Sequence, residues 1–341
     1  MFVYLYFKFS DDGFYIYIVL SCQWQSLCGF GWSSTAATVV CRMLGFPPAT
    51  GAPEKSAFGV GSVSMRLHEF SYHGTDHQLA ECPMDTTSSY EGLLYFCDDN
   101  EEAGVVCGTP NVTARLSDGG AHNQGRVELN VNDLWGTVAD PEWDRKDGDV
   151  VRRMLGLLPA SGTPGGAIFG QGTGIVWLSH VNCLGNETST TDCGNDGGWE
   201  TGRLYSYNEH ANDAGVICGE PNVQLRLVDS PSGSDKDGRV ELGIGGVWGG
   251  VCSLEWDLRD IAVVCQMFGL PPASVAQGET VFGNSGDKPW LGNLECIGNE
   301  YSTTECPHRG WGNTDRFLCD GKSDAGVIGG PPYSESFQYR S

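Results

Sequence analysis

The sequence has no apolar run long enough to cross a membrane. A spanning helix needs about 20 mostly apolar residues, and the best candidate, residues 1–22, is interrupted by Lys8, Asp11 and Asp12. The same segment has no basic start, so it is a poor match to a secretory signal peptide. No membrane span is predicted, and whether residues 1–21 are a signal peptide or an artefact stays open.

Basic residues are also few. The chain has 20 Lys and Arg against 43 Asp and Glu, a net charge of −23. Phosphate groups of nucleic acids and anionic membranes are bound by clustered Lys and Arg. We therefore expect no nucleic acid partner and no direct lipid contact, and a polyanionic ligand would need a bridging cation.

Catalytic motifs are missing. The glycine-rich segment GQGTG (170–174) lacks the strand–GxGxxG–helix order of a phosphate-binding loop. No Gly-x-Ser-x-Gly nucleophile elbow occurs. The sequence therefore predicts a protein that is not an enzyme and holds no organic cofactor.

Cysteine and glycine are abundant. The 14 cysteines form no CxxC pair, and the 49 glycines suit short strands joined by turns. Such cysteine usage is typical of extracellular disulfides rather than zinc sites. Asn111 and Asn186 begin Asn-x-Thr sequons and are predicted glycosylation sites. The expected location is extracellular, either secreted or in the ectodomain of a cell-surface receptor.

The chain repeats itself three times. Trp24, Trp135 and Trp248 recur at spacings of 111 and 113 residues, and each copy ends in a related segment: EEAGVVCG, NDAGVICG and SDAGVIGG. The predicted domains are 13–108, 112–219 and 223–330, hereafter repeats 1, 2 and 3. Repeat 1 is predicted to be incomplete at its start. Residues 1–12 have no counterpart, and 331–341 form a polar tail.

The segment 238–269 shows how one repeat is built. Val240 and Leu242 alternate as in a half-buried strand. Asp257 is placed to cap a helix, with Asp260 at the reciprocal capping-box position. Apolar residues then follow at helical spacing until Gly269 ends the helix. Each repeat is therefore predicted to contain strands and one short helix.

These motifs resemble the scavenger receptor cysteine-rich family. The resemblance rests on GRVEL…WGxVC, WDLRDIAVVCQMFGLP, WLGNLECIGNEYSTTECPHRGWG and SDAGVI in repeat 3 and on their counterparts in the other repeats. It implies an α+β fold, in which a curved antiparallel sheet cradles one α-helix and disulfides staple the domain. The chain would hold three such domains in tandem.

The family pattern also implies a disulfide pairing. Carried onto this sequence, it gives Cys28–Cys97, Cys41–Cys107, Cys183–Cys193, Cys252–Cys319 and Cys296–Cys306. It leaves Cys82, Cys218 and Cys265 unpaired, because other residues stand where their partners would be, and it has no place for Cys22, which is an extra cysteine. Extra Cys22–Cys82 and Cys218–Cys265 bridges, or buried thiols, both stay open.

Candidate binding residues lie in the repeated GRVEL strand. Arg126 and Glu128, like Arg239 and Glu241, are two residues apart and share one face of a strand. We expect that face to be exposed, and the resemblance associates the stretch with binding of bacterial surfaces. The alternative is an ordinary surface ion pair, worth less than about 1 kcal/mol.

The resemblance implies a Ca²⁺ site as well, formed by acidic residues after the first cysteine and before Asp-Ala-Gly. Only repeat 2 keeps candidates for it: Asp140, Asn212 and Asp213. Since Ca²⁺ takes six to eight oxygen ligands, this site is possible in repeat 2 only.

The sequence thus predicts an extracellular, scavenger-receptor-like protein that recognises microbial or host macromolecules, proteins or glycans, through several repeats. The alternative is a non-catalytic fragment of a larger mosaic protein, such as a protease, a lysyl-oxidase-like enzyme or an adhesion receptor, with the repeats as spacer or docking modules. Ligand identity, oligomeric state and any further domain stay open.

Overall fold

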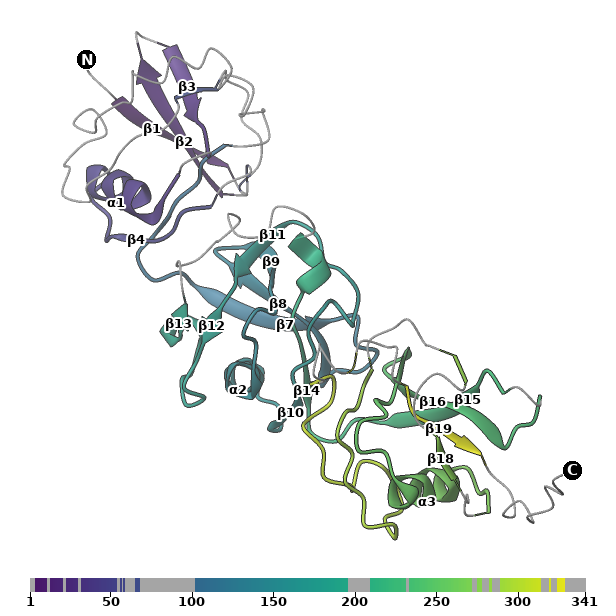
Figure 1. Ribbon diagram of the computed structural model, residues 1–341. Coiled ribbons are helices and arrows are strands. Elements are labelled where there is room, and N and C mark those ends of the chain that lie inside the picture. The colour runs from purple at the N-terminus through teal and green to yellow at the C-terminus, as the bar shows by residue number, and fades with distance from the viewer. Residues whose placement is uncertain are drawn as a thin grey trace, which may run out of the picture. The chain divides into compact units, whose positions relative to one another are not determined.

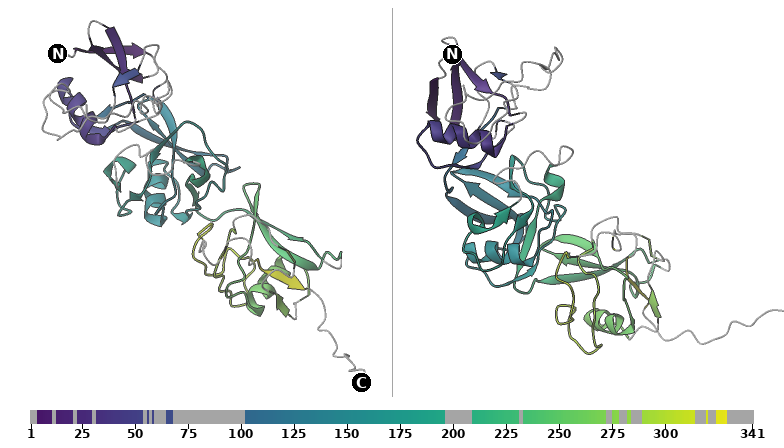
Figure 2. Two further views of the ribbon diagram at one scale, coloured as in Figure 1. Left: turned by 45° about the horizontal axis from the view of Figure 1, so that its top comes forward. Right: turned by 60° about the vertical axis from the view of Figure 1, so that its left-hand side comes forward.

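The computed structural model describes residues 4–10, 13–20, 23–29, 32–53, 56, 58, 65–67, 102–195, 209–230, 233–271, 275–277, 282–283, 289–313, 319 and 324–328. The chain packs as two compact units: residues 1–115 with 127–156 and 171–214, and residues 116–126 with 157–170 and 215–341. In each repeat one helix lies beside the strands (Figure 1; Figure 2).

In its described residues, repeat 1 contains a four-stranded sheet, a separate strand pair and one helix. The sheet has the order β1-β2-β3-β5, and β4 pairs with β6. The elements are β1 (Tyr4–Ser10), β2 (Gly13–Leu20), β3 (Gln23–Leu27), α1 (Ser34–Met43), β4 (Ala49–Gly51), β5 (Met65–Leu67) and β6 (Val106–Cys107).

Repeat 2 contains a six-stranded sheet of order β10-β14-β8-β9-β11, with β7 also paired to β8. Its elements are β7 (Val112–Ser117), β8 (Gln124–Val131), β9 (Leu134–Val138), α2 (Arg145–Met154), β10 (Ala160–Gly162), β11 (Ile175–Leu178), β12 (Val181–Asn182), the 3₁₀ turn η3 (Thr190–Asp192), β13 (Gly194–Asn195), the 3₁₀ turn η4 (Glu209–Asn212) and β14 (Gly215–Cys218).

Repeat 3 contains a five-stranded sheet of order β15-β16-β19-β18, with β17 also paired to β16. Its elements are β15 (Val223–Val228), β16 (Asp237–Ile244), β17 (Val247–Gly250), α3 (Leu258–Met267), β18 (Val275–Gln277) and β19 (Gly326–Ile328). The predicted α+β fold class is therefore confirmed. The pairings are antiparallel except β3–β5 and β9–β11, which are parallel.

The start of repeat 1 differs from the sequence expectation. Residues 4–10, which have no counterpart in the repeat pattern, form β1 and pair with β2 from Tyr4↔Val19 to Ser10↔Gly13. This strand takes the place that β15 has beside β16 in repeat 3. The segment YLYFKFS is rich in aromatic residues, which favour strands, although it shares no motif with the other repeats.

The helices are capped as the sequence predicts. Asp257 accepts the N–H of Asp260, and the side chain of Asp260 accepts the N–H of Asp257, which closes the capping box of α3. Asp144 and Asp147 form the same box on α2. Gly269 follows α3 with a φ of +66°, a conformation that suits glycine.

The second aspartate of each capping box also binds the loop that begins at Cys183 in repeat 2 or Cys296 in repeat 3. The other carboxylate oxygen of Asp260 accepts the N–H of Cys296 at 3.0 Å, and that of Asp147 accepts the N–H of Cys183 at 2.9 Å. Both carboxylates are 1% exposed. One buried side chain thus fastens the helix start to the loop that follows the sheet.

The core of repeat 3 lies between α3 and β16. Val240, Leu242 and Ile244 on one face of β16 are fully buried, as is Ile261 on the helix. Burying each of these side chains contributes roughly 1.5–3 kcal/mol. Arg239 and Glu241 alternate with the buried apolar residues of β16, so they lie on the opposite face of the strand.

Asp147 is expected to make the stability of repeat 2 depend on pH. Burial raises the pKa of Asp147 from 3.8 to about 6, against the lowering effect of the Cys183 and Asp144 N–H groups. The folded state then binds this proton more tightly than the unfolded state does. Its contribution to stability is therefore greatest below about pH 4 and decreases by up to about 3 kcal/mol as the pH rises to about 6.

Urea unfolding of the wild type and Asp147→Asn at about pH 4.5 and about pH 7 measures this effect. The variant should lose more stability, relative to wild type, at the lower pH. Asp260→Asn should behave alike, because burial raises the pKa of Asp260 too. A wild-type-minus-variant difference that is the same at both pH values would contradict the prediction.

Candidate functional site: the arginine–carboxylate ladders

Repeat 3 carries a row of alternating charges on the face of β16 that lies away from the helix. We call Trp248, Arg226, Glu241, Arg239 and Asp229 the ladder of repeat 3. Arg226 on β15 stands opposite Glu241 on β16, and its Nε and Nη2 lie 2.7 and 2.6 Å from Glu241 Oε2. Arg239 Nη2 lies 2.7 Å from the other oxygen of the same carboxylate.

Arg239 is the buried centre of this ladder, at 5% exposure. Its Nη1 pairs with Asp229 and also donates to the carbonyl oxygen of Phe282 at 3.1 Å. Asp324 Oδ2 lies 3.7 Å from Nε. Hydrogen bonds to Glu241 and Asp229 raise the pKa of Arg239, although burial acts in the opposite direction and is the largest single effect.

The outer end of the ladder is half exposed. The guanidinium of Arg226 lies 4.2 Å from the ring centre of Trp248, a cation–π contact. The side chain of Arg226 is 45% exposed, and that of Asp229 at the other end is 57% exposed. The ladder therefore has a buried middle and two accessible ends.

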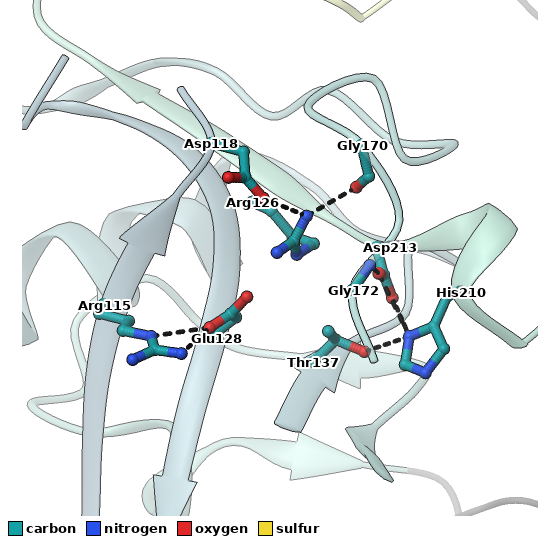
Figure 3. A network of polar contacts seen from close by, with 9 residues as sticks. All are labelled: Arg115, Asp118, Arg126, Glu128, Thr137, Gly170, Gly172, His210 and Asp213. Atoms are coloured by element: carbon teal, nitrogen blue, oxygen red, sulfur yellow. Dashed lines mark hydrogen bonds and ion pairs between the residues drawn. The ribbon is translucent and has the colours of Figure 1, made fainter. Parts of the chain in front are cut away.

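Repeat 2 has the corresponding ladder: Trp135, Arg115, Glu128, Arg126 and Asp118. Arg115 Nε and Nη2 lie 2.7 and 2.6 Å from Glu128 Oε2, and its guanidinium is 3.9 Å from the ring centre of Trp135. Arg126 Nη1 lies 2.8 Å from Asp118 Oδ2 and donates to the carbonyl of Gly170 at 3.0 Å (Figure 3). Arg115 is 50% exposed.

The prediction that the four GRVEL residues lie on a solvent face is wrong. Arg126, Glu128, Arg239 and Glu241 are all 5–7% exposed. The reason is that this face of the sheet is covered. The arginine of the preceding strand lies over each glutamate, and the Phe-Gly loop (Phe169-Gly170 and Phe282-Gly283) supplies the carbonyl that caps each inner arginine.

The accessible residues of the ladders are ones that the sequence analysis did not select. Arg115 and Arg226 occupy the same place in VTARL and VQLRL. Their repetition, one strand before a glutamate, could have marked them as candidate binding residues. It becomes decisive only with the strand register, since that register places Arg226 opposite Glu241.

The structure places the predicted calcium residues next to one another. Asp140 N–H donates to the carbonyl of Asn212 at 2.6 Å. The Asp213 carboxylate is fully buried, accepts the N–H of Gly172 at 2.7 Å and lies 3.3 Å from His210 Nδ1 (Figure 3). The Ca²⁺ site of repeat 2 therefore stays a prediction, since Ca²⁺ needs six to eight oxygen ligands.

Within the described part of the chain, one other group of possible metal ligands lies close together: Cys296, Glu300 and Cys306. Its two cysteines are joined as a disulfide. The carboxylate of Glu300 accepts the N–H groups of Ile297 and Gly298 at 2.7 and 2.8 Å. This group therefore shapes a loop rather than binding a metal.

The structure contains disulfides that match the implied pairing. Sulfur–sulfur bonds join Cys41–Cys107, Cys183–Cys193, Cys252–Cys319 and Cys296–Cys306. Cys28 is also disulfide-bonded, while its implied partner Cys97 lies outside the described residues, as do Cys22 and Cys82. Cys218 and Cys265 are buried thiols, so the possible bridge between them is not formed.

Arg152 stands where repeats 1 and 3 have Cys41 and Cys265. Its Nε lies 3.2 Å from Asp149 Oδ1, one helical turn earlier, and its side chain is 25% exposed. The charge is thus paired and partly solvated rather than buried alone, which is what a guanidinium on a helix face requires.

The repeated strand pair, helix, disulfides and ladders agree with the comparisons with known proteins. A family-wide model described as "Scavenger receptor cysteine-rich domain" (SRCR) matches residues 15–108, 117–219 and 231–329. The chain belongs to the SRCR family. Each matched range lies within one of the three repeats predicted from the sequence.

A relative and two solved structures give further matches. An SRCR domain superfamily protein of Patiria pectinifera is 33% identical over 306 residues, covering 89% of this chain and 25% of that protein. The third SRCR domain of murine neurotrypsin is 38% identical, covering 32% of this chain and 96% of its own, with a TM-score of 0.28. The SRCR domain of mouse MARCO, in its dimeric form, is 38% identical, covering 28% and 87%, with a TM-score of 0.25.

Family membership fixes the coarse properties of the chain. SRCR domains are extracellular modules that generally bind extracellular ligands, and the family is generally non-catalytic. Among the described residues, no helix has the length and hydropathy of a membrane span. The chain spans a quarter of the length of the relative from Patiria pectinifera.

The inner and outer arginines of a ladder should differ in their effect on stability. Arg239→Met removes the cation beside the buried carboxylates of Glu241 and Asp324, although Arg226 still pairs with Glu241, and should cost about 3–5 kcal/mol. Arg226→Ala removes a half-exposed pair and a cation–π contact and should cost about 1–2 kcal/mol. Urea unfolding of the two variants compares them directly, and equal losses would contradict the assignment of a buried centre.

Proposed function

We propose that this protein is an extracellular binding protein that recognises microbial or host macromolecules through several SRCR repeats at once. The observation that carries the proposal is the half-exposed arginine stacked on tryptophan at the same place in repeats 2 and 3. Repeats 2 and 3 differ at many other positions. An exposed Arg–Trp pair that both repeats retain therefore favours a common binding function.

Arg115 and Arg226 have the chemistry of contact residues. The ring of Trp135 or Trp248 supports one face of the guanidinium, and Glu128 or Glu241 fixes its orientation. A guanidinium carries five N–H donors, and the half-exposed side chain leaves some of them accessible. Such a group binds carboxylates of proteins and acceptor oxygens of glycans, with little loss of side-chain freedom because it is already held in place.

Several weak contacts can together give useful affinity. A single exposed arginine contributes little on its own, but linking modules on one chain makes the second contact intramolecular and raises the overall affinity by orders of magnitude. The net charge of −23 opposes long-range attraction of polyanions. The proposed ligands are therefore proteins or glycans bound through short-range contacts, rather than strongly anionic polymers.

The alternative function is a spacer or docking role within a longer mosaic protein, such as a protease, a lysyl-oxidase-like enzyme or an adhesion receptor. The observation that favours it is that the matched relative is about four times as long as the aligned region. In that case the ladders would stabilise the repeats without contacting a ligand, and the repeats would not bind surfaces by themselves.

Removing both outer arginines should weaken binding to surfaces. The test is a pull-down of the full chain on whole bacteria and on an immobilised extracellular-matrix preparation. Arg115→Ala with Arg226→Ala should reduce the bound fraction about tenfold or more, since both sites of a linked pair are lost. The proposed contacts use no metal ion, so EDTA should leave wild-type binding unchanged.

The matched control is Arg145→Ala with Arg259→Ala. These exposed arginines lie at the first turns of α2 and α3, in the same two repeats, so the change in net charge is identical. Equal binding by the wild type and both double variants would show that the outer arginines of the ladders do not contact the ligand. No binding by the wild type to any surface would favour the spacer role.

Glycosylation provides a separate test of the extracellular assignment. Asn111 precedes β7, Asn186 lies in the loop after Cys183, and both residues are exposed together with the threonines of their sequons. Expression in secreting animal cells should therefore give a mass that decreases on peptide-N-glycosidase treatment, with two glycans lost. Asn111→Gln and Asn186→Gln should each remove one, and an unmodified secreted protein would contradict the prediction.

A further inference from the structure

In the second compact unit, a short segment of repeat 3 lies along the edge strand of repeat 2. Trp311 N–H donates to the carbonyl of Ser161 at 3.2 Å, and Gly162 and Trp311 form a parallel β-bridge. The side-chain oxygen of Asn313 accepts from Thr163 twice, from N–H at 3.3 Å and from Oγ1 at 3.1 Å. Gly310–Asn313 therefore continues the sheet of repeat 2 beyond β10.

Two glycines make this approach possible. A Cβ on Gly162 would lie 2.3 Å from the carbonyl oxygen of Trp311 and 2.7 Å from its Cβ. A Cβ on Gly312 would lie 2.3 Å from Cβ of Pro164. All three distances are shorter than the 3.0 Å below which real Cβ atoms essentially never approach a non-bonded atom, so a side chain at either position would push the two segments apart.

The contact also joins hydrophobic side chains of the two repeats. Trp311 is fully buried, and Phe169 of repeat 2 meets Trp290 of repeat 3 with ring centres 5.7 Å apart. Phe169 and Ile217 belong to the same buried cluster as the core of repeat 3. A corresponding ring pair occurs one repeat earlier, where Phe58 and Trp177 lie 6.4 Å apart.

The receiving strand has a sequence signature that the last repeat lacks. Gly51, Gly162 and Val275 are equivalent, because they pair with the equivalent residues Val106, Ile217 and Ile328. Two residues further on, the chain has Pro53, Pro164 and Gln277. Glycine and proline are thus present in the two repeats that another repeat follows. Valine and glutamine replace them in repeat 3.

We propose that the outer edge of β10, with Gly162 and Pro164, is a docking surface for the Gly-Trp-Gly-Asn segment of the following SRCR repeat. The contact makes repeats 2 and 3 one cooperative unit. Repeat 3 lacks this signature, because Val275 stands where repeat 2 has Gly162. This docking is a contact within the chain and requires no ligand.

Hydrogen–deuterium exchange of the full chain tests this docking. Gly162→Val, which copies repeat 3 into repeat 2, should speed exchange in residues 308–313 about tenfold or more, because an overpacked contact opens more often. Trp311→Ala should do the same. The two changes combined should add little to either alone, since both remove one contact.

The control is Gly51→Val, the same substitution at the equivalent position of repeat 1. It should leave exchange in residues 308–313 at the wild-type rate, whatever it does to repeat 1. Wild-type exchange in the Gly162→Val chain, or fully additive effects of the two changes, would overturn the proposal. So would a wild-type dimer that Gly162→Val converts to monomer, because the segment would then dock between two chains.

Discussion

A guanidinium withdrawn from water must be surrounded by acceptors, and much of the structure follows from how Arg239 and Arg126 meet this requirement. Beside the inner arginine lies the preceding strand, whose own arginine covers the glutamate. The inner arginine also draws in the Phe-Gly loop, whose carbonyl completes the shell. Register, loop position and the half-exposed outer arginine are thus consequences of one buried charge. Replacing such a group is costly because its carboxylate partners would remain behind.

The sequence sufficed for the features that depend on local chemistry. The capping boxes, the glycine after each helix and the alternation in β16 are all readable from neighbouring residues, and the structure contains them. The family resemblance supplied the fold class. Exposure could not be read in this way, because strand alternation separates two faces without saying what covers each. Arg126 and Arg239 were therefore predicted to be exposed, because the sequence does not show which strands and loops cover them.

Repeats 2 and 3 also show how the fold tolerates the loss of disulfides. Repeat 1 joins its helix to its last strand through Cys41–Cys107. Repeat 2 has Arg152 at the helix position, paired with Asp149, and keeps a buried Cys218. Repeat 3 keeps a buried Cys265 and the long Cys252–Cys319 bridge. Across these differences the capping carboxylate that reaches the Cys183 or Cys296 loop is unchanged. The hydrogen bond from the capping aspartate to this loop is present in both repeats, whereas the long disulfides differ between them.

The last strand of repeats 2 and 3 lies inside the sheet rather than at its edge. β14 sits between β8 and β10, and β19 sits between β16 and β18. A ribosome releases these strands only after the rest of the repeat. Until then β8 or β16 exposes an unpaired edge, and the partners on either side cannot be joined. Repeats 2 and 3 therefore cannot complete their sheets until their last strands have been synthesised. While this chain is made, the sheets of repeats 2 and 3 therefore stay open in turn, and each open edge is exposed to non-native pairing.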